Sequence, residues 1–190
     1  MEYPQLANFF EAEYALNRDQ VAELISSFQL RTYLKGTALL REEAYERKLR
    51  FLNSGVVREY YGTTEKEVNI NFYTHPQFIS DFTAFMRGQP SKKYQEALSP
   101  VDVLELEKEE LLTFLKKNPH GKRFIERCFQ RILQVQEAFE YNRMTKAPED
   151  LYRDLRIYKP DWLQLIPQYH IAAFLGITPE TLSRIRKRIS

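Results

Sequence analysis

Residues 168–187 read QYHIAAFLGITPETLSRIRK, and this stretch decides how the C-terminal part of the chain folds. Ile171 and Leu175 lie four residues apart, on one face of a predicted helix. Ala172, beside them, is small enough for a second helix to approach closely. Gly176 stands where the first helix must end and the chain must reverse, which requires a positive φ. The pattern predicts two helices joined by a tight turn.

The second helix of this pair has clear start signals and two distinct faces. Thr178 is a good N-cap, and Pro179 suits the first helical position. Leu182 and Ile185 form the buried face. The opposite face carries Glu180, Thr181, Ser183, Arg184, Lys187 and Arg188. A short helix with an apolar inner face and a polar, basic outer face can enter the major groove of DNA.

Composition places this helix pair in a chain of 190 residues with 43% hydrophobic and 14% aromatic residues. Residues 151–190 hold seven Lys or Arg against three Asp or Glu, whereas the chain as a whole has a net charge of only +2. The basic excess at one end indicates an anionic partner there, although a solvated helix is the simpler alternative. The single Cys excludes an intrachain disulfide and an iron–sulfur cluster held by this chain alone, and a cytoplasmic location is expected.

The region from Phe28 to Leu106 has the texture of a β structure. Short β-prone stretches alternate with turn signals such as Asn53-Ser54-Gly55, a spacing typical of a sandwich or barrel. The segment 68–73 has period two, which predicts that Val68, Ile70 and Phe72 share one face. Helices are expected before this region, over residues 17–28, and after it, over residues 108–117.

A longer helix is predicted from about residue 121 to residue 146, which has no Gly or Pro inside it. Five residues on it are spaced 3, 4, 3 and 4 apart, and these form the predicted dimer seam: Ile125, Cys128, Ile132, Val135 and Phe139. The alternative is a single wide stripe that faces the core. Cys128 is expected to act as a small apolar residue, with a disulfide across a dimer as the minor alternative.

Taken as a whole, the chain resembles the CRP/FNR-type bacterial transcription regulators, and is most similar to the short members found in Bacteroidetes. The motifs that carry the resemblance are residues 33–36, 51–58, 78–82 and 88–91, and above all LGITPETLSR at 175–184. The resemblance implies an α+β protein with three parts. Residues 1–118 would form an N-terminal antiparallel β-roll of the double-stranded β-helix or jelly-roll type. Residues 119–147 would form a long dimerisation helix, and residues 148–190 a C-terminal winged helix-turn-helix.

The same resemblance assigns Glu180, Ser183 and Arg184 to base readout. Their chemistry agrees, because Arg can make two hydrogen bonds to guanine, Glu can accept from cytosine N4, and Ser suits either role. The position before Glu180, where the family often has another reader, is Pro179. Phosphate contacts or support are expected from Gln168, Tyr169, Thr178, Thr181, Lys187 and Arg188. The implied partners are a second copy of the chain, an inverted-repeat DNA duplex and RNA polymerase.

The effector pocket departs from the pattern of members that bind cyclic AMP. Their Gly-Glu pair reads Ser80-Asp81 here, and their Arg-Ser pair reads Ser91-Lys92. The Arg that holds the cyclic phosphate is therefore missing, and a Lys lacks its two-pronged geometry. We expect any pocket to involve Asp81, Ser91 and Lys92, and to take a different small-molecule effector or none.

No other chemistry is expected from the sequence. It has no Gly-rich phosphate loop, nucleophile elbow or zinc-protease motif, so an enzyme is not predicted. No cofactor, metal or membrane segment is expected, and His75, His120 and His170 are interpreted as surface or capping residues rather than haem ligands. The alternative function is a signalling or ligand-binding module whose helix-turn-helix serves protein contact only.

Overall fold

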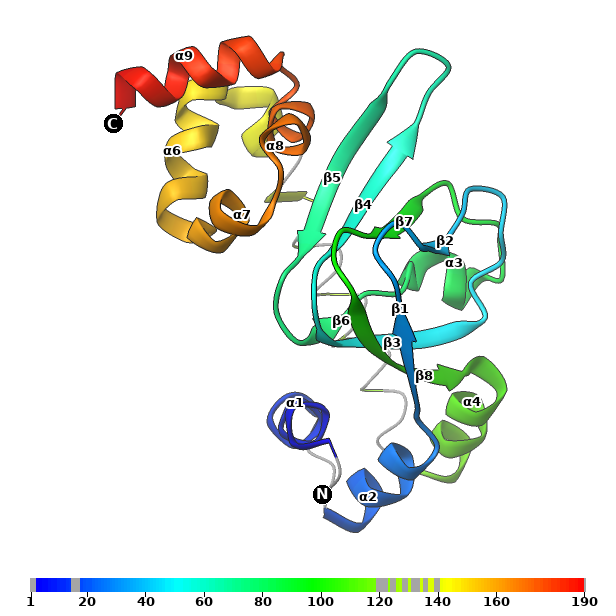
Figure 1. The fold of residues 1–190 in the computed structure, drawn as a ribbon. Helices are drawn as coiled ribbons and strands as arrows, with labels where there is room; N and C mark the ends of the chain where they lie inside the picture. The colour runs from blue at the N-terminus through cyan, green and yellow to red at the C-terminus, as the bar shows by residue number, and fades with distance from the viewer. Residues whose placement is uncertain are drawn as a thin grey trace.

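The computed structural model describes residues 3–14, 18–118, 123, 126–127, 130, 134, 137–138 and 141–189. Two antiparallel β-sheets form the centre of the molecule, with helices α1, α2 and α4 at one end and the helices α6 to α9 beyond the other (Figure 1). This confirms the predicted α+β class with an N-terminal β-roll.

Each sheet has four strands, and all the pairings are antiparallel. The first sheet has the order β1-β8-β3-β6 and the second the order β2-β7-β4-β5. The core between the sheets is formed by buried residues such as Leu52, Val57, Ile79 and Val103. The strands are β1 (Gln29–Tyr33), β2 (Ala38–Leu40), β3 (Lys48–Ser54), β4 (Val57–Gly62), β5 (Glu67–Tyr73), β6 (Gln77–Phe78), β7 (Tyr94–Ala97) and β8 (Val101–Glu107).

Gly55 allows the turn between β3 and β4 to pass close to the start of β8. It adopts φ +94°, and a Cβ at this position would lie 2.4 Å from the carbonyl oxygen of Pro100. No side chain fits there without movement of the backbone, so the predicted turn at residues 53–55 requires glycine at this position.

Helices cover the outer side of the first sheet. The predicted helices are confirmed as α2 (Arg18–Ser26) and α4 (Lys108–Lys117). The sequence analysis missed α1 (Pro4–Tyr14) and the six-residue α3 (Phe82–Arg87). The buried residues that join these helices to the sheet are Leu6, Phe10, Val21, Leu24, Phe51, Phe85, Leu104, Leu106, Leu111 and Phe114, among others.

The segment predicted as the long helix is only partly described. Its described residues between 123 and 145 are helical, and all of them up to Tyr141 are exposed. The residues of the dimer seam (Ile125, Cys128, Ile132, Val135 and Phe139) lie outside the described residues.

The C-terminal region is purely helical over residues 141–189. It contains α6 (Pro148–Tyr158), α7 (Pro160–Leu165), α8 (Gln168–Leu175) and α9 (Pro179–Ile189). The expectation of a wing is therefore wrong for this range. Lys159 caps both α6 and α7, and only Ile166 and Pro167 separate α7 from α8, so no segment is long enough for a β-hairpin.

The helical region packs on the β-roll through α8, which lies beside β5 (Figure 1). Val56 and Phe72 of the β-roll belong to the same buried cluster as Trp162 and Ile171. The alternation predicted for β5 is wrong at its centre: Asn69 is fully buried, whereas Val68 and Ile70 are half-buried. A register shift between β4 and β5 and the cover of α8 together place this polar residue inside.

Candidate nucleic-acid interface

The corner between α8 and α9 has the local geometry that the sequence predicts. Gly176 adopts φ 71° in the left-handed region, and its N–H donates to the carbonyl groups of Ala172 and Ala173. Ala172 is completely buried where the helices meet. The Thr178 hydroxyl accepts from the N–H of Thr181 at 3.3 Å, as an N-cap does.

The two faces of α9 are as different as expected. Leu182 and Ile185 are buried at 1% and 3% exposure and hold the helix on the domain. The three predicted base readers, Glu180, Ser183 and Arg184, are all exposed. Glu180 lies in the first turn, where its own backbone N–H and then the Thr178 hydroxyl lower the pKa of its carboxyl group. The carboxylate is therefore charged at neutral pH and able to accept hydrogen bonds.

The cations of α9 divide into two groups. Arg184 and Lys187 are exposed, and neither has an ion-pair partner among the residues that the structure describes. Arg188, by contrast, forms an ion pair with Glu149 of α6 at 2.8 Å. A phosphate contact from Arg188 would therefore have to replace this pair.

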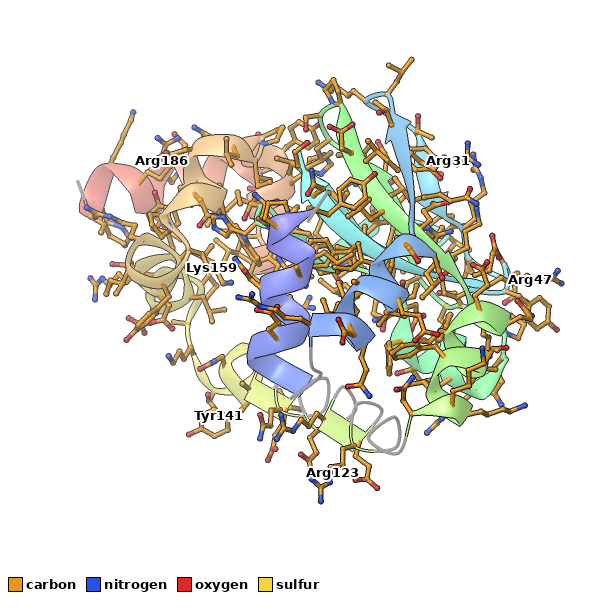
Figure 2. All side chains as sticks on the ribbon, turned by 90° about the horizontal axis from the view of Figure 1, so that it is seen from below. Arg31, Arg47, Arg123, Tyr141, Lys159 and Arg186 are labelled. Carbon is orange, nitrogen blue, oxygen red and sulfur yellow. The ribbon has the colours of Figure 1, made fainter. Side chains whose placement is uncertain are left out.

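Figure 2 places this surface on the molecule. Arg186 of α9 and Lys159 lie on the helical side, whereas Arg31 and Arg47 lie on the opposite, β-roll side. At the start of α8, Gln168 and Tyr169 are exposed, and Thr181 of α9 is half-buried. The supporting residues named from the sequence therefore lie on the two helices of the corner, and most of them are exposed.

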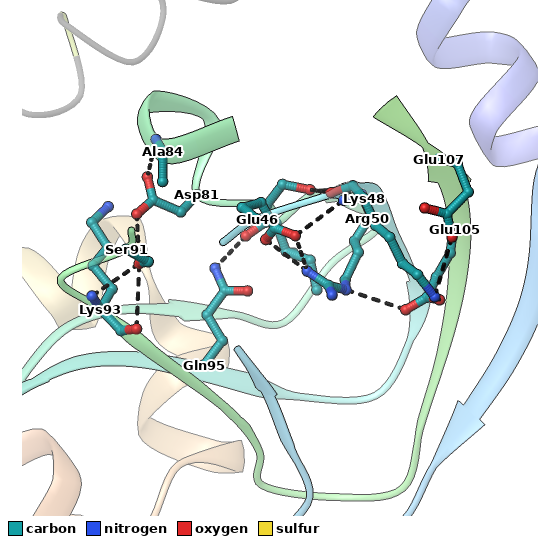
Figure 3. Close-up of polar contacts among 12 residues, drawn as sticks. Glu46, Lys48, Arg50, Asp81, Ala84, Ser91, Lys93, Gln95, Glu105 and Glu107 are labelled. Atoms are coloured by element: carbon teal, nitrogen blue, oxygen red, sulfur yellow. Dashed lines mark hydrogen bonds and ion pairs between the residues drawn. The ribbon is translucent and has the colours of Figure 1, made fainter. Parts of the chain in front are cut away.

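The position of the predicted effector pocket is closed by its own residues. The Ser91 hydroxyl donates to Asp81 Oδ2 at 2.8 Å and accepts from the N–H of Lys93 at 3.0 Å (Figure 3). Asp81 Oδ1 accepts from the N–H of Ala84, so this carboxylate is the N-cap of α3. Ser91 and Asp81 are buried, whereas Lys92 is exposed. The structure thus brings Asp81 and Ser91 together and leaves Lys92 outside.

A buried carboxylate next to this position is also fully used. Glu59 accepts from Lys93 Nζ at 2.9 Å, from Gln95 Nε2 at 2.8 Å and from the Tyr73 hydroxyl at 3.0 Å. Burial lowers the pKa of Lys93, but the carboxylates of Glu59 and Asp81 outweigh it, so the pKa rises and the ammonium stays charged. Lys93 is therefore held in place by carboxylates of the β-roll itself.

A second buried network lies at the first sheet and was missed by the sequence analysis. Arg50 Nη1 lies 2.6 Å from both carboxylate oxygens of Glu46, and Arg50 Nε lies 3.2 Å from Glu105 Oε1 (Figure 3). Glu105 also accepts from the Tyr33 hydroxyl and from Lys48. Burial first, and then Glu105, raise the pKa of Tyr33 to about 12. Only the unusual charge of Arg50 inside the apolar strand Leu49–Leu52 signals this network in the sequence.

The interpretation of the histidines needs one correction. His170 is buried at 6% exposure between α8 and β5, where it is neither a surface nor a capping residue. His75 is exposed and lies 3.2 Å from Asp161, and His120 lies outside the described residues. Among the described residues, no group of three or more His, Cys, Asp or Glu is placed to hold a metal ion.

These features define a class of fold: a β-roll followed by a C-terminal helical domain, as in the CRP/FNR-type regulators. Residues 30–118 match the family described as cyclic nucleotide-binding domain. No curated protein matches the sequence. None of the helices in the described part of the chain is long and apolar enough to cross a membrane.

Three solved structures illustrate the likeness of fold. The c-di-GMP responsive global regulator CLP of Xanthomonas campestris has a TM-score of 0.70 and 14% identity, with 91% of each chain covered. FixK2 of Bradyrhizobium japonicum has a TM-score of 0.69 and 16% identity, with 85% of this chain and 84% of that chain covered. The catabolite activator protein of Thermus thermophilus has a TM-score of 0.61 and 18% identity, with 96% and 86% covered.

Proposed function

We propose that the protein is a sequence-specific DNA-binding transcription regulator of the CRP/FNR family, of the short kind found in Bacteroidetes, and that it acts as a homodimer. The observation that carries the proposal is the outer face of α9. It presents Glu180, Ser183, Arg184 and Lys187 to solvent, on a helix that is fixed from behind by Leu182 and Ile185. This combination of an anchored helix and free polar groups suits the major groove.

The division of labour within the chain follows the three predicted parts. Residues 1–118 act as the effector-type β-roll, residues 119–147 as the dimerisation helix, and residues 148–190 as the DNA-binding domain. Within the last part, Glu180, Ser183 and Arg184 read bases. The sugar–phosphate backbone of the DNA is contacted by Lys187 and by the exposed side chains of Gln168 and Tyr169. RNA polymerase is the expected protein partner once DNA is bound.

The β-roll works without cyclic AMP in this proposal. Ser91 is paired with Asp81 and Lys93 with Glu59, so neither this hydroxyl nor this ammonium group is free to hold a cyclic phosphate. A ligand would have to break buried, charge-assisted hydrogen bonds to enter, at a cost of roughly 1–3 kcal/mol for each group left without a partner.

The DNA part of the proposal is tested by selecting bound duplexes from a random pool with the full-length protein. We expect enrichment of an inverted repeat whose half-site centres lie about one helical turn apart. A pool that stays random after repeated rounds, at protein concentrations that retain DNA, would mean that α9 reads no sequence. The helix-turn-helix would then serve only contact with protein or non-specific contact with DNA.

The dimer part is tested by sedimentation of two matched variants. Ile132→Asp places a charge on the proposed seam and should convert dimer to monomer and abolish binding to the inverted repeat. Gln134 is exposed on the same helix and is not part of the seam. Gln134→Asp therefore adds the same charge and should leave the dimer intact. A wild-type protein that is monomeric at tens of micromolar would refute the proposal.

A further inference from the structure

The contact between the β-roll and the helical domain has an apolar part and a polar part. In the apolar part, the centroid of the Phe72 ring of β5 lies 5.0 Å from that of Trp162 and 6.0 Å from that of Phe174, in edge-on and tilted contacts. Thr74 and His75 both contact the carboxylate of Asp161 in α7. The two regions are therefore packed against each other through side chains and not only joined by the chain.

The polar part of this contact consists of His170 from α8 and two residues from the β-roll. His170 Nδ1 lies 3.4 Å from Arg58 Nη1 and 3.3 Å from Asn69 Nδ2. The same Asn69 amide donates to the carbonyl oxygen of His170 at 3.0 Å. This bond places the nitrogen of the amide, and not its oxygen, toward α8.

This arrangement determines the protonation state of the imidazole. A guanidinium has only N–H donors, and the Asn69 amide nitrogen is also a donor. His170 Nδ1 can therefore contribute only a lone pair, and the ring proton must be on Nε2. A second proton on Nδ1 would place three donors against one another and a positive charge within 3.4 Å of Arg58.

We propose that His170, Arg58 and Asn69 form an acid-sensitive latch, and that protonation of His170 releases the helical domain from the β4–β5 face of the β-roll. The latch itself follows from the contacts among these three residues. That it regulates DNA binding rests on the proposed function.

The charged groups that face His170 come from strands β4, β5 and β7 of the β-roll. Arg58 of β4 is the cation, and it is held by Glu67 of β5 at 2.5 Å and by Glu96 of β7 at 2.7 Å. Burial, and then Arg58, lower the pKa of His170 to about 4, while Glu96 and Glu67 act in the opposite direction without outweighing them. On α8 itself the neighbouring ring is that of Tyr169, which carries no charge at neutral pH.

The direction of the pH effect follows from this depressed pKa. The docked state favours neutral imidazole, so docking is at full strength above the ordinary pKa of 6.5 and weakens as the pH falls toward about 4. At pH 5.5 the ratio of docked to released molecules should be roughly tenfold lower than at pH 7.5.

Trp162 is the only tryptophan of the chain and lies in the contact with Phe72, so it reports release directly. We would measure acrylamide quenching of Trp162 in the full-length protein between pH 7.5 and 5, without DNA. The quenching constant should rise at low pH in the wild type, while the far-ultraviolet circular dichroism stays constant.

Two matched variants assign the effect. His170→Gln keeps a neutral side chain at every pH and should remove the rise, whereas His120→Gln, which removes a histidine 50 residues earlier in the sequence, should retain it. An unchanged rise in His170→Gln, or a flat profile in the wild type, would overturn the latch.

A further measurement tests the latch even if the His170→Gln variant does not fold. In the wild type, the imidazole proton resonances should show one histidine that titrates far below pH 6.5, and His75→Gln and His120→Gln should both retain it. The absence of a histidine that titrates in this low range would equally overturn the latch. Binding of the selected DNA at pH 7.5 is measured separately, so failure of the latch is distinguishable from failure of the proposed function.

Discussion

The interior of the β-roll and the outer face of α9 use charge in opposite ways. In the β-roll, Arg50 is buried and Lys93 half-buried, and each is paired with carboxylates of the same domain. On α9, Arg184 and Lys187 are exposed and have no ion-pair partner among the described residues. The difference shows that a similar set of residue types can stabilise a domain in one place and remain available to an outside partner in another.

The largest expected effect comes from breaking the balance inside the β-roll. Glu46→Ala removes a side chain with no exposed surface, and Glu105 is then the carboxylate that remains paired with Arg50. We expect a loss of about 1.5–3 kcal/mol in the free energy of unfolding, because buried hydrogen bonds to a charged group are lost while Arg50 keeps its contact with Glu105. Urea unfolding followed by circular dichroism measures it.

Glu107→Ala is the matched control for this prediction. Glu107 is half exposed and lies 3.6 Å from Lys48, so its removal should cost less than about 1 kcal/mol. Equal losses for the two variants would mean that the buried network contributes no more than a surface pair.

On α9 the expected effect is on binding and not on folding. Arg184→Ala should weaken binding to the selected duplex by roughly 1–3 kcal/mol and relax the preference for one G·C pair, while the free energy of unfolding stays the same. Mobility-shift titrations on selected and scrambled duplexes measure this. Lys187→Ala, which removes the same charge from the same helix, should weaken both duplexes equally. If Arg184→Ala also weakens both equally, Arg184 contacts phosphate and reads no base.

The cap of α9 sharpens the comparison, because it separates the stability of the helix from its surface chemistry. Thr178→Ala removes the hydroxyl that accepts from Thr181 and should destabilise the helical domain by about 1 kcal/mol. Ser183→Ala, at an exposed position of the same helix, should change the stability by no more than about 0.5 kcal/mol. Urea unfolding followed by Trp162 fluorescence measures both, and equal values would contradict the capping role.

No effect at all is expected when cyclic AMP is added. The Asp81–Ser91 pair and the Glu59–Lys93 pair leave no unsatisfied cation for a phosphate, so titration calorimetry should show no saturable heat up to millimolar nucleotide. Ser91→Arg should not create binding either, because Ser91 is fully buried and has no room for a guanidinium. Saturable binding with a micromolar constant would show that the pocket opens.

Sequence patterns predicted the helix-turn-helix closely and the buried networks hardly at all. Gly176, Thr178 and Leu182 each have a local requirement, namely a positive φ, a cap or an apolar face, which can be inferred from neighbouring residues. Arg50 and Glu105 meet across paired strands from distant parts of the chain, and no local pattern announces such a pairing.

The latch residues were missed for a related reason. Asn69 lies inside a strand whose alternation predicted an outward position, and it is buried only because α8 covers it. His170 is one of several polar residues near the start of α8. It is buried against the β-roll, where its contact Asn69 lies 101 residues earlier in the chain. Helix α1 was missed because Leu6 and Phe10 form too short an apolar pattern to indicate a helix alone.

The central claim, that the cations of α9 serve DNA and those of the β-roll do not, is tested by the salt dependence of binding. The variant Arg184→Gln/Lys187→Gln and the variant Arg31→Gln/Arg47→Gln each lose two exposed positive charges, from opposite sides of the molecule (Figure 2). For the α9 variant we expect at least about tenfold weaker binding to the selected duplex, and a plot of log affinity against log salt that is flatter by about one unit per half-site. The β-roll variant should match the wild type in both. Equal losses of affinity and slope in the two variants would contradict the account, because DNA would then respond only to net charge.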